Sequence, residues 1–213
     1  MADLPYKKYR FLELGHPVQR VAWWTVWALL FFPGMLLFRW LPGPRRNLPG
    51  REPFLLLANH TSFFDPVWIT YWLGRPSTYM ASEVVFSKPF LKWVLPLTGA
   101  FPKAFGKKDV AAMRNLTERY EAGDPVVIFP EGARSYDGRP LPVLPGIGRT
   151  VKRMGAKVVV ARIKTGHLFH PRWARYPRWV RVIVEHETLP DFAPDADPAQ
   201  ITETIRQAMQ IDP

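Results

Sequence analysis

Short apolar runs separated by helical segments are the feature that most constrains the fold of this chain. The runs at 53–58 (PFLLLA), 126–129 (VVIF) and 157–163 (KVVVARI) have the length and composition of strands buried on both faces. Segments with helical spacing lie between them, among them 66–73 and 109–122. Strands that alternate with helices predict an α/β fold with a central, mostly parallel or mixed sheet flanked by helices.

The remaining elements complete this alternation. They are a strand at 78–82, a helix at 89–97 interrupted at Pro96, a strand or turn at 99–102, a helix from near Gly146 to 153, a last strand at 179–187 at a sheet edge, and an amphipathic helix at 197–210. The chain has 213 residues and is 47% apolar, which excludes a disordered chain. This length suffices for one substantial core plus an appendage.

An eighteen-residue run without a charge, 21–38, precedes the alternation, and a Pro-Gly pair at 33 divides it. The run is marginal for crossing a bilayer, which needs about 20 residues. Basic residues flank both ends, so a single crossing would place one basic cluster on the unfavoured side. We expect a bent helical pair that dips into one leaflet; the alternative is a buried pair packed on the soluble domain. The Pro-, Gly- and Arg-rich stretch 41–52 marks the boundary between an N-terminal segment, 1–50, and the main domain, 51–213.

The formal net charge of +11 calls for an anionic partner, such as nucleic acid, a phospholipid surface, or an acidic protein or substrate. Basic and aromatic residues interleave most densely late in the chain, at Arg172, Trp173, Arg175, Tyr176, Arg178, Trp179 and Arg181. This pattern is typical both of nucleic-acid-binding surfaces and of membrane-facing loops. The charge-free N-terminal run favours the membrane, so we expect a phospholipid membrane and no nucleic acid as partner. Cysteine is absent, which removes disulfides, thiolate metal sites and any cysteine-bound intermediate.

The strand predicted at 53–58 leads into the sequence NHTSFFD, residues 59–65. This stretch would place an imidazole at the end of a strand and a carboxylate five residues later, at the start of a helix. A histidine, with an ordinary pKa of about 6.5, can act as a general base, and a nearby carboxylate can orient it. The competing interpretation is that Asp65 only caps the helix and that His60 is an ordinary loop histidine.

A second polar stretch, FPEGARS at 129–135, leaves the end of another predicted strand, where α/β sheets usually bind their ligands. Glu131 offers an acceptor for a hydroxyl group, and Gly132 allows a ligand to approach the backbone closely. Arg134 offers a guanidinium fork that fits a phosphate. The competing interpretation is a surface turn in which Glu131 pairs with Arg134.

Together and in this order, NHTSFFD and FPEGARS resemble the two signature blocks of the glycerolipid acyltransferase family, of the 1-acylglycerol-3-phosphate acyltransferase type. The resemblance covers roughly 53–187 and includes the hydrophobic N-terminal segment. It implies a glycerol-3-phosphate acyltransferase-like fold, with an N-terminal hydrophobic helical membrane motif and an acyltransferase catalytic domain at 51–213. It also implies that His60 is the general base and Asp65 its orienting partner, and that the acceptor is positioned by Glu131, Gly132, Arg134 and Ser135.

The reaction implied by the resemblance transfers a fatty acyl chain from acyl-carrier protein or acyl-CoA to the free hydroxyl of a lysophospholipid. The expected acceptor is 1-acyl-sn-glycerol 3-phosphate, which would give phosphatidic acid. We expect the enzyme on the cytoplasmic face of the cell's inner (cytoplasmic) membrane, with no metal and no bound cofactor. Ser62 as a nucleophile is the rival mechanism, but no Gly-x-Ser-x-Gly sequence surrounds it.

The weaker blocks of the family pattern match poorly. The later block usually has a proline within a valine-rich strand, and the valine run at 158–160 has none. Between the two blocks, members commonly carry an arginine soon after a glycine and a phenylalanine, whereas this chain has Gly99 and Phe101 followed by Lys103, Lys107 and Lys108. Lys103 is the candidate that would bind the acceptor phosphate there, as a point charge without the guanidinium fork. The mismatch leaves other acceptors open, such as a lyso-ornithine lipid or another lysophospholipid. A non-enzymatic, basic lipid-binding protein is the alternative from a different class.

Overall fold

The computed structural model describes residues 21–22, 24–25, 28–29, 48–50, 52–75, 77–89, 91–97, 99–103 and 110–210 of the chain. The membrane motif expected at 21–38 lies outside these residues, apart from six helical ones between 21 and 29. No helix within the described ranges is both long and apolar enough to cross a membrane. Lys107 and Lys108 also lie outside the described residues.

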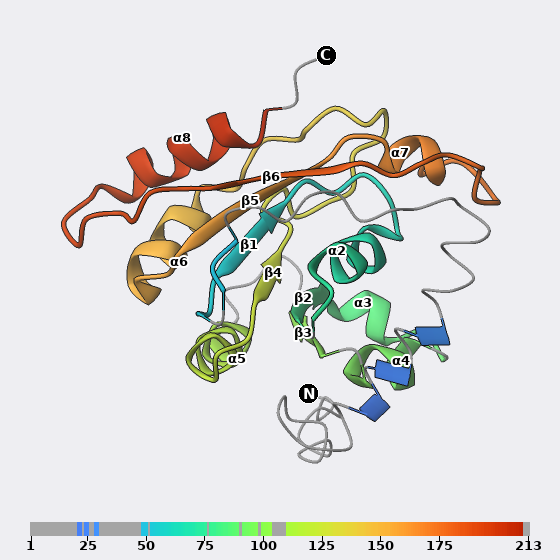
Figure 1. Ribbon diagram of the computed structural model, residues 1–213, viewed down its shortest axis with the longest axis horizontal. Coiled ribbons are helices and arrows are strands. Elements are labelled where there is room, and N and C mark those ends of the chain that lie inside the picture. The colour runs from blue at the N-terminus through green and yellow to red at the C-terminus, as the bar shows by residue number, and fades with distance from the viewer. Residues whose placement is uncertain are drawn as a thin grey trace.

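A six-stranded mixed sheet with helices on both faces forms the centre of the molecule (Figure 1), as the sequence predicts. The strands are β1 (Leu55–Ala58), β2 (Thr78–Ser82), β3 (Ala100–Lys103), β4 (Val126–Ile128), β5 (Val158–Ile163) and β6 (Val184–Thr188), in the order β3-β2-β4-β1-β5-β6. Neighbouring strands are parallel throughout, except that β6 runs antiparallel to β5.

The apolar character of β1 follows from its place between β4 and β5. All four residues of β1 are fully buried, because both of its edges are paired and both of its faces are covered. Leu56 and Ala58 belong to the core on one face, and Leu55 and Leu57 to the core on the other, as the two-residue period of a strand requires.

Helices cover the two faces of the sheet (Figure 1). The helices are α2 (Asp65–Leu73), α3 (Glu83–Phe86), α4 (Leu91–Leu97), α5 (Val110–Glu121), α6 (Gly146–Met154), α7 (Gly166–Phe169) and α8 (Pro198–Ala208). Helix α2 ends at Gly74, whose left-handed φ of 63° fits a glycine and whose N–H bonds Thr70 O at 3.0 Å. Residues of α2 contribute to the Leu56 core, and residues of α5, α6 and α8 contribute to the Leu55 core.

The structure corrects the predictions for the last strand and for the helix that contains Pro96. The last strand begins at Val184 rather than at 179, because Thr165 holds the preceding residues in a loop: its hydroxyl donates to Arg181 O (2.7 Å) and accepts from Ile183 N (3.0 Å). Helix α4 begins at Leu91 and continues through Pro96 to Leu97, so the interruption predicted at Pro96 does not occur. The one-turn helices α3 and α7 were not predicted from the sequence.

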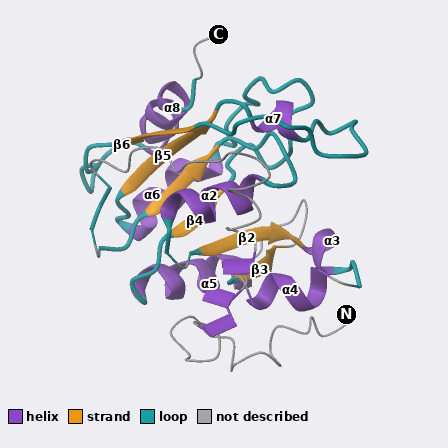
Figure 2. Ribbon diagram, turned by 45° about the vertical axis from the view of Figure 1, so that its right-hand side comes forward, coloured by secondary structure: helices purple, strands orange, loops and turns teal. Residues whose placement is uncertain are grey.

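The parallel arrangement determines where the two polar stretches lie. Strands β1 and β4 are adjacent and parallel, so the loops that follow them leave the same edge of the sheet. Helix α7 follows β5 and so also starts at this edge (Figure 2). The segments 59–65, 129–135 and 165–170 therefore converge there.

Candidate active site

Asn59 fixes the start of the first loop. Its side chain is fully buried and makes two hydrogen bonds to one residue at the end of β5: Nδ2 donates to Ile163 O (3.1 Å), and Oδ1 accepts from Ile163 N (2.6 Å). The amide thus takes the place of the next backbone pair as β1 and β5 separate. His60 therefore leaves the sheet from a rigid position.

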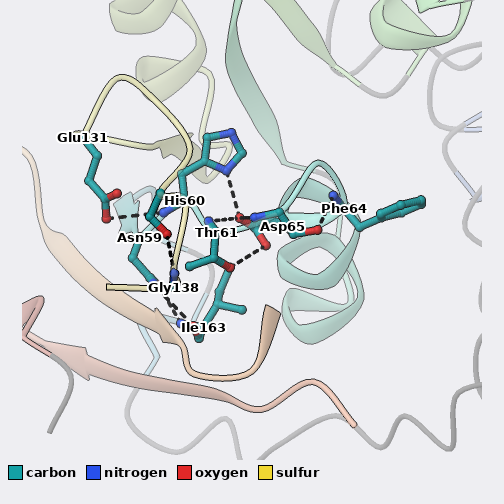
Figure 3. Close-up of polar contacts among 10 residues, drawn as sticks. Asn59, His60, Thr61, Phe64, Asp65, Glu131, Gly138 and Ile163 are labelled. Atoms are coloured by element: carbon teal, nitrogen blue, oxygen red, sulfur yellow. Dashed lines mark hydrogen bonds and ion pairs between the residues drawn. The ribbon is translucent and has the colours of Figure 1, made fainter. Parts of the chain in front are cut away.

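His60 and Asp65 form a hydrogen-bonded pair (Figure 3). Nδ1 of His60 lies 2.8 Å from Oδ2 of Asp65, so the carboxylate fixes the ring with a proton on Nδ1. The other ring nitrogen, Nε2, then carries the lone pair and points away from Asp65. The His60 side chain is 21% exposed, whereas that of Asp65 is completely buried. This arrangement presents a basic nitrogen at the surface of the site.

The contacts of Asp65 decide against its interpretation as a simple helix cap. Its Oδ2 accepts hydrogen bonds from Thr61 N (2.5 Å) and Ser62 N (2.7 Å), which precede α2, and not from N–H groups of the helix. The N-cap residue of α2 is Phe64, which makes no side-chain capping bond. The carboxylate therefore turns back to the loop that carries His60. A negative charge at this helix N-terminus is also electrostatically favoured.

Helix α7 closes the space behind the carboxylate. A Cβ atom at Gly166 would lie 2.5 Å from Thr61 Oγ1 and 3.0 Å from Asp65 Oδ1, so a larger residue would displace both groups. On the other side, the ring of Phe129 stacks on that of His60, with centroids 4.2 Å apart and planes at 21°. The imidazole is thus held between an orienting carboxylate and an aromatic plane.

The second polar stretch lies against the first. Ser135 N donates to His60 O at 2.8 Å. His60 N lies 3.4 Å from Glu131 Oε1 (Figure 3). Ser135 is buried, and its hydroxyl accepts from Gly138 N (3.1 Å), which makes it a link within the loop. Gly132 has a φ of 70°, and a Cβ atom there would lie 2.9 Å from Leu144 Cδ1, so the turn itself requires glycine.

Glu131 is a buried carboxyl group at the junction of the two loops. Burial raises the pKa of Glu131 to about 8, and the nearby Asp65 carboxylate adds to the increase, while the backbone N–H groups of Leu141 and His60 act against it. The second oxygen, Oε2, has no hydrogen-bond partner within the described part of the chain. No ion pair joins Glu131 to Arg134 among the described residues, so the interpretation as a paired surface turn fails.

The raised pKa of Glu131 predicts a specific dependence of stability on pH. Between the unfolded pKa of about 4.5 and the folded pKa of about 8, the unfolded chain loses this proton before the folded chain does. The free energy of unfolding therefore falls as pH rises through this window. In the Glu131→Gln variant, the fall in the free energy of unfolding between pH 5 and pH 8 should be smaller than in the wild type by on the order of 3 kcal/mol. Urea unfolding at the two pH values measures this difference. The matched control, Glu121→Gln at an exposed position, should leave the pH difference as in the wild type.

The structure places the two candidate phosphate-binding residues differently. Arg134 lies next to Ser135, and therefore beside the His60 loop, and it forms no ion pair with a carboxylate within the described residues; its carbonyl oxygen accepts from Arg172 Nη1 at 3.5 Å. Lys103 is the last residue of β3, which is an outermost strand of the sheet. Strands β2 and β4 lie between β3 and β1, a separation of about 14 Å. The structure therefore does not bring Lys103 against His60.

Ser62 is not placed as a nucleophile. It is fully buried, its N–H donates to Asp65, and its Oγ accepts from Phe64 N at 3.2 Å. Its contacts are those of a residue that shapes the loop.

Asn59 and Gly166 are the positioning residues that sequence reasoning missed. Asn59 stands beside His60 in the motif, and a polar residue directly after a buried strand was the available signal. We expect Asn59→Ala to lower the free energy of unfolding by about 3 kcal/mol, because it leaves the buried N–H and C=O of Ile163 unpaired. Urea unfolding would measure this loss. The control variant Asn115→Ala, on α5, should change the free energy of unfolding by no more than about 0.5 kcal/mol. An equally small change in Asn59→Ala would contradict the prediction.

The fold and the site define a class of protein: a mixed α/β sheet that carries a carboxylate-oriented histidine at the ends of its parallel strands. The sequence model of the Acyltransferase family matches residues 44–164, more than half of the chain. The chain therefore belongs to the acyltransferase family.

Individual relatives are more distant. A 1-acyl-sn-glycerol-3-phosphate acyltransferase of Chlamydomonas reinhardtii is 29% identical over 170 residues, which cover 78% of this chain and 50% of the relative. The chloroplastic 1-acyl-sn-glycerol-3-phosphate acyltransferase BAT2 of Brassica napus is 29% identical over 116 residues, or 53% of this chain and 33% of the relative. The chain thus spans half or less of the length of these curated relatives.

A solved structure shares the fold. The crystal structure of the 1-acyl-sn-glycerophosphate acyltransferase PlsC from Thermotoga maritima matches with a TM-score of 0.61 and covers 92% of this chain and 95% of that one. The sequence identity is 18%, so this likeness concerns the fold alone.

Proposed function

We propose that the protein is a membrane-bound O-acyltransferase that acylates the free hydroxyl of a lysophospholipid. The observation that carries the proposal is the His60–Asp65 pair, whose geometry leaves Nε2 as an available base beside the FPEGARS loop. The names of the relatives support 1-acyl-sn-glycerol 3-phosphate as the acceptor and phosphatidic acid as the product. The acyl donor is acyl-carrier protein or acyl-CoA, both of which are anionic and suit a chain with a net charge of +11.

The transfer proceeds in one addition and one elimination. Nε2 of His60 takes the proton of the acceptor hydroxyl while its oxygen attacks the thioester carbonyl carbon. Asp65 stabilises the imidazolium that forms. The C–S bond then breaks, the new ester remains on the acceptor, and the leaving thiolate receives the proton from the imidazolium. No side chain of the protein has to carry the acyl group.

The FPEGARS loop supplies the acceptor-binding groups. Arg134 binds the acceptor phosphate, Glu131 interacts with the acceptor head group, and Gly132 and Ser135 hold the turn that places them. Lys103 lies three strands from the strand that precedes His60, so it would contact a part of the bound substrate that is distant from the reacting hydroxyl. We further propose that residues 1–50 attach the acyltransferase domain, 51–213, to the cytoplasmic face of the inner membrane.

Arg134→Ala should raise KM for 1-acylglycerol 3-phosphate about 10- to 100-fold with little change in kcat, because it removes charge-assisted hydrogen bonds to the phosphate. Arg134→Lys should recover part of the affinity, since the charge returns without the fork. Arg139→Ala is the matched control, because this arginine is exposed on the same loop and pairs with Asp137. A KM that responds equally to both alanine substitutions would contradict the role of Arg134.

An acceptor panel tests the proposed substrate. The purified chain should acylate 1-acylglycerol 3-phosphate in preference to lyso-ornithine lipid or lysophosphatidylcholine, at equal donor concentration. Equal or faster acylation of an acceptor without a phosphate monoester would overturn the choice of acceptor. Binding of all three lipids without transfer would indicate a basic lipid-binding protein instead.

A further inference from the structure

The segment between α7 and β6 exposes an unusual set of side chains. We call residues 170–183 the Arg–Trp loop. Trp173, Tyr176 and Trp179 are 58%, 68% and 74% exposed. Large aromatic side chains that gather on a surface mark an interaction site rather than ordinary solvent-facing structure.

The Arg–Trp loop is held in a defined shape. At its start, Ala174 N bonds Pro171 O (2.9 Å), and in its middle Arg178 N bonds Phe169 O (2.7 Å). At its end, the Thr165 hydroxyl bonds both Arg181 O and Ile183 N. The exposed rings are therefore presented by a fixed backbone.

The charge of the loop has one sign. No acidic residue occurs from 164 to 184, whereas the loop contains Arg172, Arg175, Arg178 and Arg181. None of these four guanidinium groups forms an ion pair with a carboxylate in the part of the chain that the structure describes. Two of them lie over aromatic rings instead, Arg178 over Trp173 (4.7 Å) and Arg175 over Tyr176 (5.3 Å).

The loop starts and ends at the edge of the sheet that carries His60. It follows α7, which packs behind Asp65, and it leads into β6 at Val184, opposite Ile163. Arg172 reaches Arg134 O, and the His170 ring lies 5.4 Å from the Phe64 ring. From there the loop projects beyond the end of the sheet (Figures 1 and 2).

We propose that the Arg–Trp loop docks on an anionic phospholipid surface beside the mouth of the site, as a second membrane contact besides the N-terminal segment. Tryptophan and tyrosine rings favour the membrane interface, and arginine side chains bind lipid phosphates. An acidic carrier protein would match the charge but leaves the three exposed rings unexplained. The loop lies beyond residues 44–164, the part matched by the family model. The proposal rests on the proposed function, because docking here brings the site to its lipid acceptor.

Because the chain contains no cysteine, a single introduced cysteine can be labelled specifically on this surface. The full chain is labelled with an environment-sensitive fluorophore at Trp173→Cys, at Trp179→Cys or, as a control, at Gln200→Cys in the first turn of α8. Vesicles of phosphatidylcholine with or without about one-third phosphatidylglycerol are then added. We expect a blue shift at 173 and 179 that requires the anionic lipid, and none at 200. Labels at 173 and 179 that stay in water while the protein sediments with the vesicles would overturn the proposal. So would a blue shift caused by an acidic carrier protein without vesicles.

A charge variant separates docking from chemistry. Arg175→Gln, Arg178→Gln and Arg181→Gln combined should weaken binding to the anionic vesicles at least tenfold, because each arginine near such a surface contributes about fivefold. The same variant should acylate a short-chain, water-soluble acceptor as the wild type does. Loss of activity on that acceptor would overturn the proposal, since the arginines would then serve the reaction itself. A wild-type chain without any transferase activity would refute the proposed function but leave the fluorophore result intact.

Discussion

His60→Ala is expected to lower kcat about 10³-fold while leaving the protein folded. General-base catalysis contributes about 10²- to 10⁴-fold, and Nε2 of His60 is the base in the proposed reaction. The side chain is partly exposed, and within the described residues its one hydrogen bond is to Asp65, so its loss should change the free energy of unfolding by about 1 kcal/mol. Steady-state kinetics with saturating donor and acceptor, together with a urea unfolding curve, measure both quantities.

Ser62→Ala is the matched control for this variant, because Ser62 belongs to the same loop and is the rival nucleophile. We expect less than a fivefold (roughly 1 kcal/mol) change in kcat, since Ser62 is fully buried and its hydroxyl accepts a hydrogen bond from the backbone N–H of Phe64. The reverse pattern, with an inactive Ser62→Ala and an active His60→Ala, would replace direct transfer by a serine mechanism.

Asp65→Asn is expected to lower kcat about 10²- to 10³-fold with little change in KM. The amide oxygen can still accept from Thr61 N and Ser62 N, so the loop keeps its shape, but the amide carries no charge to stabilise the imidazolium. The expected stability is within about 1 kcal/mol of the wild type. Kinetics at several acceptor concentrations separate kcat from KM.

Asp65→Ala serves as the comparison that isolates the structural part of this residue's role. It leaves the buried N–H groups of Thr61 and Ser62 without an acceptor, each at a cost of about 1–3 kcal/mol. We therefore expect it to be both inactive and clearly destabilised. If Asp65→Asn turned over like the wild type, the carboxylate would be needed only for the fold of the loop.

The core of the fold was predictable because its strands are buried on both faces. Such strands appear in the sequence as unbroken apolar runs, which is why β1, β4 and β5 lie close to their predicted ranges. Strand β6 is at an edge and is only partly buried, so its composition does not mark its start, and the contacts of Thr165 decide it. Those contacts join residues far apart in sequence.

The same distinction applies to the site. The pairing of His60 with Asp65 is local, four residues of loop between them, and the motif predicted it. The two bonds of Asn59 to Ile163 span 104 positions of the chain, and the close approach of Gly166 to Asp65 likewise depends on the order of the strands. Strand order also places Lys103 on an outermost strand, three strands away from β1, which the linear spacing of the motifs does not indicate.

The central claim is that the imidazole of His60 activates a lipid hydroxyl for direct attack on an acyl thioester. The most direct measurement is mass spectrometry after incubation of the purified protein with an isotopically labelled acyl thioester and 1-acylglycerol 3-phosphate. The account predicts labelled phosphatidic acid from the wild type, almost none from His60→Ala, and no acyl group attached to the protein. An acylated protein intermediate, or bound substrates without any labelled product, would contradict it.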